Sequence, residues 1–373
     1  MPAAKTALVV GGGVAGMSSA LMLQRAGLDV TLVDLDPNWR VAGAGITITA
    51  STLRAFRTIG ILERVMEEGH THPGVRVCTV DGTPVEEVRS PPLGDDLPGA
   101  GGILRPVLHG ILSDRVKALG LPVRLGVTAE SFAQDASGVA VRLTDGTESR
   151  FDMVVGSDGI FSRMRQILFP DAPKPQFTGQ ACWRLMTARP AEIDRRHFFL
   201  GGPVKVGLTP VSKSEMYLFL LEHVPSNPRR EPKDQHRLLR ELLTGFGGVL
   251  ARVRDELNEG SRIVYRPLEG QILRRDWFSG RVILIGDAAH ASTPQLASGA
   301  GMAAEDGIVL GEEVQRSSTV EAAFRGFMQR RFDRCRLVVE NSLEIGRLEM
   351  TGAPLDQQTA ILARSLQALA API

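Results

Sequence analysis

The feature that most constrains the fold is a glycine-rich turn near the N-terminus, which reads GGGVAG from Gly11 to Gly16. A short apolar run with β-branched residues, Thr6–Val10, precedes this turn and predicts a buried strand. A helical pattern follows over residues 14–26, and a second apolar strand is expected over 29–35. A strand, a helix and a strand within about thirty residues predict a βαβ unit, and with it a parallel sheet.

The spacing of the glycines fits the dinucleotide fingerprint GxGxxG. In that fingerprint Gly11 permits the tight turn, Gly13 lets backbone amides approach a pyrophosphate, and Gly16 allows close helix packing. Asp34 ends the second strand, close to the ~20-residue interval at which an acid binds a ribose hydroxyl. A phosphate-loop NTPase is excluded because Met17 stands where that motif requires lysine. The fingerprint alone leaves open whether the dinucleotide is NAD or FAD.

Length and charge narrow the class of protein further. The 373 residues predict two or three domains, or one large fold with an insertion. Lys and Arg number 43 against 42 Asp and Glu, so a net charge of +1 gives no basic surface for nucleic acid or anionic membrane. Cys78, Cys182 and Cys335 form no CxxC pair, so neither a disulfide framework nor a zinc ribbon is indicated, and we expect no bound metal.

The N-terminus superficially resembles a signal peptide, because Lys5 precedes the first apolar run. The glycine triplet ends that run after a handful of residues, which is too short for a signal sequence. No apolar run approaches the ~18 residues of a membrane-spanning helix. We therefore expect a soluble, cytoplasmic protein without a membrane partner.

Beyond the βαβ unit, the pattern predicts a helix over 51–69 and, from residue 75, short alternating strands. The runs 75–80 and 85–88 flank Asp81-Gly82, which predicts a hairpin. A strand-rich stretch at 198–221, a helix at 235–243, a strand at 282–285 and helices at the end follow. This order predicts a βαβ-type domain interrupted by a second domain, to which the last third of the chain returns.

Two later segments carry motifs of their own. Residues 152–165 read DMVVGSDGIFSRMR, a strand running into an Asp-Gly turn, and residues 280–290 read GRVILIGDAAH, a strand ending in Gly-Asp. Together with GxGxxG, their order and spacing resemble the single-component FAD-dependent aromatic hydroxylases of the p-hydroxybenzoate hydroxylase fold, through Arg347. Residues 179–221 are most similar to the branch that holds the quinolone, urate and hydroxybenzoate hydroxylases.

The resemblance implies an α/β fold with a Rossmann-type FAD-binding domain, an inserted mixed-sheet substrate domain and C-terminal helices. It places a discontinuous FAD-binding domain at residues 1–74, 100–172 and 268–330. The substrate domain takes residues 75–99 and 173–267, and a C-terminal helical segment takes 331–373.

By the same resemblance, Asp34 holds the adenosine ribose, and Arg40 can take the adenine-side contact because Leu35 replaces the usual arginine. Arg105 is expected at the ribityl–phosphate region and Asp287 at the ribityl chain. The full set of expected FAD contacts is Gly11, Gly13, Val14, Ala15, Gly16, Asp34, Arg40, Gly45, Arg105, Asp158, Asp287, Pro294, Gly299, Ala300, Gly301 and Met302.

The loop from Pro294 to Met302 is expected along the isoalloxazine ring. A helix predicted from Ala300 to about residue 314 directs backbone amides at the N1/O2 edge, where reduced flavin is anionic. Asp158 is expected to shape its turn and help order the cofactor's phosphate or nicotinamide side. Arg165 is expected to brace that motif, and His290 to be structural rather than a catalytic base.

On the substrate side, the resemblance points to Lys205, Tyr217 and Arg184. Lys205 stands where the urate-type enzymes carry a substrate-contacting arginine, and Tyr217 matches their tyrosine. Each has a plain alternative: a solvated strand-end lysine, a core tyrosine, and an interdomain salt bridge for Arg184. Gln295 replaces an acid of the urate-type enzymes, which argues against urate as the substrate.

The implied activity is an FAD-dependent monooxygenase that uses NADH or NADPH and O₂ to hydroxylate a small aromatic or heteroaromatic substrate through a flavin C4a-hydroperoxide. The oligomeric state is expected to be a monomer or a homodimer. Epoxidation or reduction on the same fold, a two-component arrangement, and a non-catalytic flavin protein that sequesters a ligand are the alternatives.

Overall fold

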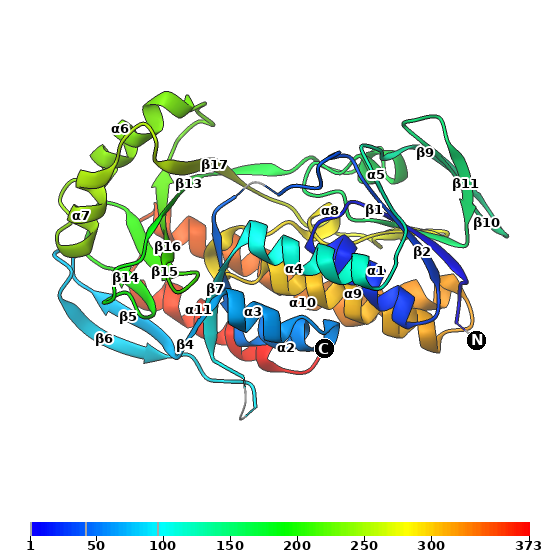
Figure 1. Cartoon of the computed structure of the whole chain (residues 1–373), viewed down its shortest axis with the longest axis horizontal. Helices are drawn as coiled ribbons and strands as arrows, with labels where there is room; N and C mark the ends of the chain where they lie inside the picture. The colour runs from blue at the N-terminus through cyan, green and yellow to red at the C-terminus, as the bar shows by residue number, and fades with distance from the viewer. Residues whose placement is uncertain (1, 42, 95–96) are drawn as a thin grey trace.

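The computed structural model describes residues 2–41, 43–94 and 97–373. The predicted α/β fold is confirmed: a six-stranded and a seven-stranded sheet lie toward opposite ends of an elongated molecule, with long helices running between them (Figure 1). No helix in the described part of the chain is both long and apolar enough to cross a membrane.

The six-stranded sheet has the order β18-β19-β12-β1-β2-β8 and contains the predicted βαβ unit. Strand β1 (Thr6–Val10) is parallel to β2 (Asp29–Asp34) on one side and to β12 (Met153–Gly156) on the other. Helix α1 (Val14–Arg25) packs on α9 (Gly299–Arg316), where Cβ atoms added at Gly307 and Gly311 would lie within 2.8 Å of the α1 backbone. The outer strands are β8 (Val123–Leu125), β19 (Val282–Leu284) and β18 (Phe278–Ser279).

The single helix expected over 51–69 is wrong, because the chain forms two helices there. Helix α2 (Ala50–Ile59) ends at Gly60, which adopts a left-handed conformation with φ 82°, and α3 (Leu62–Glu68) follows. Glycine is the residue that takes this conformation at low cost, so it closes α2 despite the continuous apolar pattern. Helix α4 (Arg105–Ala118), with Pro106 in its first turn, is an element that the sequence pattern did not predict.

Two small sheets complete the fold, one beside the six-stranded sheet and the other near the centre of the molecule. Strands β9 (Ala129–Asp135), β10 (Gly138–Leu143) and β11 (Glu148–Phe151) form an antiparallel sheet, followed after β12 by α5 (Arg163–Leu168). Strands β3 (Gly45–Thr49), β7 (Ala100–Leu104) and β4 (His70–His72) form the second, which faces the seven-stranded sheet.

The seven-stranded sheet has the order β17-β13-β16-β15-β14-β5-β6. The predicted hairpin around Asp81-Gly82 is confirmed as antiparallel β5 and β6. The strands are β5 (Gly74–Cys78), β6 (Pro84–Arg89), β13 (Gln176–Ala188), β14 (Arg196–Phe199), β15 (Lys205–Pro210), β16 (Glu215–His223) and β17 (Arg262–Gly270). Helices α6 (Pro232–Leu242) and α7 (Gly248–Glu256) pack on one face of this sheet, in the core around Trp183. The opposite face, called the inner face here, is directed toward β3 and β7. The domain boundaries expected from the sequence stay predictions.

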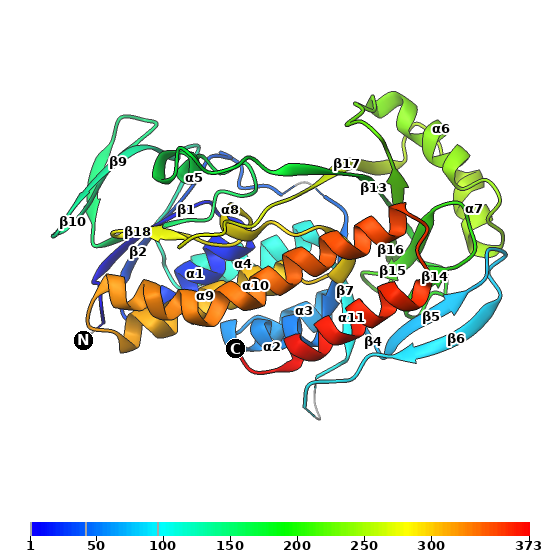
Figure 2. The same ribbon diagram turned by 180° about the vertical axis from the view of Figure 1, so that it is seen from behind.

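Helical elements close the chain beside the six-stranded sheet. Helix α10 (Val320–Met350) runs from that sheet to the seven-stranded sheet, and α11 (Leu355–Ala370) returns along it (Figure 2). The short α8 (Asp287–His290) and a 3-10 turn, η1 (Pro294–Leu296), lie between β19 and α9. All three cysteines are buried and free, as the sequence predicts.

Candidate active site

The glycine turn leaves open space in front of helix α1. Gly11 has φ 105°, and a Cβ added at Gly16 would lie 1.8 Å from the Gly11 carbonyl oxygen, so both positions need glycine. A Cβ at Gly13, the N-cap of α1, would meet nothing within 4 Å. This combination of a tightly packed turn and a free helix N-terminus fits the pyrophosphate of a dinucleotide.

Asp34 lies beside this turn as the fingerprint requires. Its Oδ2 accepts a hydrogen bond from the Gly12 amide at 2.6 Å, and its Oδ1 accepts one from the Asp36 amide at 2.8 Å. The buried indole of Trp39 donates to the Gly12 carbonyl oxygen at 3.1 Å, so Trp39 covers the turn next to Asp34. The side chain of Arg40 is exposed, and its adenine-side role stays a prediction. Trp39 was missed by the sequence reasoning, because no motif marks it.

The Asp-Gly motif is held together from within. The Asp158 carboxylate accepts hydrogen bonds from the Ser162 hydroxyl and, at 2.9 Å, from the Met164 amide at the start of α5. Arg165 donates to the carbonyl oxygens of Ile160 at 2.7 Å and Ala288 at 3.0 Å. The predicted bracing role of Arg165 is therefore confirmed, and it ties this motif to the Gly-Asp motif. A contact of Asp158 with cofactor stays a prediction.

The Gly-Asp motif lies against the glycine turn. Gly286 has φ 57°, and a Cβ there would lie 2.7 Å from the Cβ of Ala15. Asp287, the first residue of α8, is exposed, yet the surrounding protein desolvates its carboxyl and raises its pKa, while His290 and Arg105 oppose that shift. An exposed carboxylate in a hollow of protein atoms fits a side chain that lines a ligand site, and His290 and Arg105 are the positive groups that act on it.

The loop between α8 and α9 carries the remaining residues expected at the flavin. Ala297 takes a left-handed conformation with φ 51° directly after η1, and α9 then begins at Gly299. A Cβ at Gly301 would lie 2.4 Å from Thr52 Oγ1 of α2, so this helix start is closely packed. Met302 is buried. The first turn of α9 therefore leaves amides free at its N-terminus, the arrangement expected at the ring's N1/O2 edge.

A buried ionic cluster links the middle of α9 to α8 and α10. Asp306 Oδ2 accepts hydrogen bonds from the Gly286 amide at 2.8 Å and from His290 Nε2 at 2.7 Å, while Arg331 Nε donates to Asp306 Oδ1 at 2.8 Å. Burial opposes protonation of His290, but Cys335 and Asp306 raise its pKa well above the ordinary value. His290, Asp306 and Cys335 lie close enough to suggest a metal site, but the contacts above already occupy both Asp306 oxygens. These contacts favour the structural role expected for His290.

The inner face of the seven-stranded sheet presents an aromatic row to this region. Arg184 of β13 pairs in register with Phe219 of β16, which pairs with Gly207 of β15, which pairs with Phe198 of β14. Gly207 leaves room for the Phe219 ring, because a Cβ there would lie 2.6 Å from that ring. Phe198 and Phe219 meet edge to face, with centroids 5.4 Å apart.

Tyr217 joins this face to β3, the strand that contains Gly45. Its hydroxyl lies 2.9 Å from the Thr47 hydroxyl, and a Cβ at Gly45 would lie 2.2 Å from the tyrosine ring. The ring is almost fully buried at 5% exposure. Arg184 is half-buried, with no hydrogen-bond acceptor among the described residues. Burial lowers the pKa of Arg105, and the nearby positive charge of Arg184 lowers it further. Arg105, Arg184 and Tyr217 thus lie near one another, and their roles toward cofactor and substrate stay predictions.

Lys205 is also on the inner face, but it has a protein partner. Its Nζ pairs with Glu349 near the end of α10, whose side chain is 8% exposed. Gln180 donates to the same carboxylate at 3.0 Å, and Gln295 donates to Gln180 at 2.9 Å. Glu349 was missed by the sequence reasoning. Its carboxylate lies beside Gln295, and Gln295 is the position at which, by the resemblance, the urate-type enzymes carry an acid.

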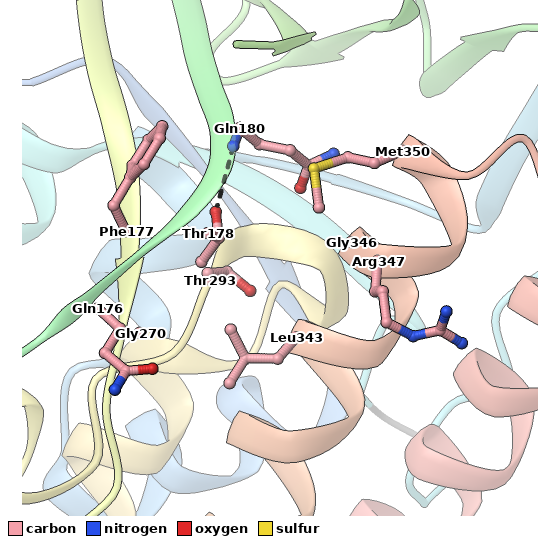
Figure 3. Close-up of a pocket in the computed structure, with 10 residues that line it drawn as sticks. All are labelled: Gln176, Phe177, Thr178, Gln180, Gly270, Thr293, Leu343, Gly346, Arg347 and Met350. Carbon is pink, nitrogen blue, oxygen red and sulfur yellow. Dashed lines mark hydrogen bonds between the residues drawn. The ribbon is translucent and has the colours of Figure 1, made fainter. Parts of the chain in front are cut away.

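A pocket of about 200 Å³ borders this polar cluster, because Gln180 lines it. Figure 3 shows it between the start of β13, the end of β17 and helix α10, with Leu343 and Met350 on the helix side. Thr293, immediately before Pro294, lines it, and its buried hydroxyl has no hydrogen-bond partner among the residues that the structure describes. None of the site residues expected from the sequence lines this pocket.

Comparison with known proteins identifies the family. A family model described as an FAD binding domain matches residues 4–338. A putative FAD-dependent monooxygenase, YetM of Bacillus subtilis, is 31% identical over 352 residues, which cover 94% of this chain and 95% of the relative. The 2-heptyl-3-hydroxy-4(1H)-quinolone synthase of Pseudomonas aeruginosa is 30% identical, covering 94% of this chain and 91% of the relative.

Solved structures agree with this assignment. 2-Methyl-3-hydroxypyridine-5-carboxylic acid oxygenase aligns with a TM-score of 0.77 at 26% identity, covering 92% of this chain and 91% of that chain. HpxO of Klebsiella pneumoniae, complexed with FAD and uric acid, shares the fold with a TM-score of 0.84 at 21% identity, covering 98% of this chain and 92% of that chain. The chain belongs to the family of FAD-dependent aromatic hydroxylases, and it is an FAD-binding flavoprotein monooxygenase.

Proposed function

We propose that this monooxygenase takes its electrons from NADH or NADPH and inserts one oxygen atom of O₂ into a small aromatic or heteroaromatic ring. The contact between Tyr217 and the β3 residues Gly45 and Thr47 carries this proposal. It brings an aromatic and cationic sheet face directly against a strand expected to contact FAD. A flat, electron-rich ring bound beside this contact would lie between the sheet face and the cofactor.

The residues expected from the motifs would hold the cofactor. The turn from Gly11 to Gly16 would receive the pyrophosphate, Asp34 the adenosine ribose, and Arg105 with Asp287 the ribityl side. FAD, when bound, would supply the hydride acceptance and the oxygen activation. The amides at the start of α9 would stabilise negative charge on the ring edge.

The inner face would bind and orient the ring to be hydroxylated. Phe219 and Phe198 offer apolar surface and exclude water, which prevents loss of the activated oxygen. The Tyr217 hydroxyl and the Arg184 guanidinium would hydrogen-bond a phenol or ring N–H and favour its deprotonated form, which makes the ring more electron-rich. Lys205 would take part in this role when the substrate competes with Glu349 for its ammonium group.

The decisive test uses purified protein reconstituted with FAD. We expect a yellow protein whose NADH or NADPH oxidation accelerates with particular members of an aromatic library, and a product heavier by one oxygen atom. Accelerated oxidation with an epoxide or a reduced product would instead support the alternative reactions. Substrate binding without any turnover would support the ligand-sequestering alternative, and dependence on a separate reductase would support the two-component arrangement.

Two relatives favour a heteroaromatic or carboxylated ring within that library. One is the quinolone synthase described above, and another is named 3-amino-4-hydroxybenzoate 2-monooxygenase from Streptomyces cremeus, which is 30% identical over 313 residues. We further propose that the enzyme works in the cytoplasm as a monomer or homodimer.

A further inference from the structure

Arg195 and Arg196, the first residue of β14, are consecutive arginines that differ sharply in their partners. Arg195 pairs with Glu87 at 2.8 Å and with Asp194 at 2.9 Å. Arg196 has no hydrogen-bond acceptor and no acidic partner among the residues that the structure describes, and its Nε is buried. Because successive side chains of a strand point to opposite faces, Arg196 reaches the inner face while Arg195 does not.

Aromatic rings hold the Arg196 guanidinium in place. Its central carbon lies 4.4 Å from the centroid of the Phe198 ring and 5.0 Å from that of Phe219. Such cation–π contacts occupy the flat faces of a guanidinium, but its N–H groups point outward in the plane and are left without acceptors. Arg196 is thus an oriented hydrogen-bond donor beside the proposed substrate site.

The groups around Arg196 do not neutralise its charge. Burial lowers the pKa of His72 to about 4, with Arg196 adding to the effect, so that histidine is neutral at pH 7. Tyr217 also faces Arg196, but its hydroxyl carries no carboxylate charge and already shares a hydrogen bond with the Thr47 hydroxyl. On the same face, Lys205 already has Glu349 as its partner. The inner face therefore keeps an excess of positive charge around Arg196.

Keeping an unpaired, half-buried guanidinium out of water costs free energy, and a ligand that supplies a hydrogen-bond acceptor offsets this cost. A carboxylate matches the planar fork of arginine with two parallel hydrogen bonds. We propose that Arg196 anchors a carboxylate of the substrate, so that the enzyme acts on aromatic or heteroaromatic carboxylates. This inference rests on the proposed function.

The anchor also sets the direction of the substrate. Arg196 lies over the Phe219 ring, whose centroid is 6.1 Å from that of Tyr217, and Tyr217 contacts Gly45 on the cofactor side. A ring whose carboxylate is bound by Arg196 therefore extends past Tyr217 toward β3. The ring edge remote from the carboxylate is the one presented for hydroxylation.

The test is a binding measurement on FAD-loaded enzyme, which needs no turnover. Benzoate, 1-naphthoate and quinoline-2-carboxylate, each with its carboxamide, are titrated while the flavin absorbance spectrum is recorded. We expect at least one carboxylate to bind more tightly than its amide, and Arg196→Gln to weaken that carboxylate roughly 10- to 100-fold with little change for the amide. Arg196→Lys should recover only part of the affinity, because it keeps the charge but loses the planar fork.

Arg195→Gln is the matched control, since it removes one positive charge from the adjacent position. We expect it to change the carboxylate affinity by less than about twofold, because a screened charge outside the site contributes little. Equal losses in the two glutamine variants, equal losses for acid and amide, or no carboxylate binding at all would each overturn the proposal. Flavin content and NAD(P)H-driven flavin reduction, measured without substrate, test the proposed function separately.

Discussion

Glu349, in the last turn of α10, pairs with Lys205 on β15, so the longest helix of the molecule ends on the inner face of the seven-stranded sheet. The pair joins two segments that are 144 residues apart. Glu349 therefore competes with substrate for the ammonium group of Lys205, the lysine expected to touch substrate.

The first prediction concerns this lysine. Lys205→Ala should raise the KM of the aromatic substrate roughly tenfold, since a hydrogen bond from a charged group contributes about 1.5–3 kcal/mol. It should also lower the product formed per NAD(P)H consumed, because a loosely held ring misses the activated oxygen. Both quantities come from parallel assays of cofactor oxidation and product.

Glu349→Gln separates substrate binding from a purely structural role of the pair. The freed ammonium should bind substrate at least as tightly as in the unaltered enzyme. If Lys205→Ala lowers only the thermal midpoint and leaves the product yield unchanged, the lysine merely fastens α10 to the sheet.

The second prediction contrasts two glycines of the first turn. Gly13→Ala should leave the apoprotein as stable as before, since its Cβ meets nothing within 4 Å, but should weaken FAD binding by about tenfold or more. Gly16→Ala should instead destabilise the fold by about 1–3 kcal/mol, because its Cβ would overlap the Gly11 carbonyl. Urea unfolding of apoprotein and fluorescence titration with FAD measure the two effects, and equal loss of stability in both variants would contradict the open space assigned to Gly13.

The features that the sequence predicted are those set by local chemistry. A glycine turn between a strand and a helix needs the same residue types wherever it occurs, so the turn at Gly11 could be placed without coordinates. The partners of Lys205 and the isolation of Arg196 depend on strands and helices brought together from far apart in the chain. No periodicity of the sequence encodes such contacts. The end of α2 at Gly60 was not predicted either, because the apolar pattern continues on both sides of it.

The third prediction concerns the Gly-Asp motif. Asp287→Ala should yield protein that folds but is purified with little or no FAD, because it removes the carboxylate expected to bind the ribityl chain. Asp171→Ala is a suitable control, since Asp171 forms only an exposed ion pair with Arg275 at 3.0 Å. Full flavin occupancy in the Asp287 variant, read from the absorbance ratio of flavin to protein, would refute the assignment.

The last prediction follows from the buried pair of His290 and Asp306. The pKa of His290 in the folded protein is raised well above its ordinary value of 6.5 by its neighbours Cys335 and Asp306, against the effect of burial. Its contribution to stability is therefore complete below about pH 6.5 and is lost as the pH rises toward the folded-state pKa, at about 1.4 kcal/mol per pH unit. The lowered pKa values of His72, His109 and His197 place their titration below this window.

Between about pH 6.5 and 8 we assign the loss of stability to His290, because it is the one described histidine whose pKa the fold raises. Over that range we expect the urea midpoint of the apoprotein to fall in the unaltered chain, and to stay nearly level in His290→Asn, whose side chain can still donate to Asp306. Because the asparagine variant lacks the titrating group but keeps a donor, a parallel fall in both proteins would show that another residue controls the pH dependence.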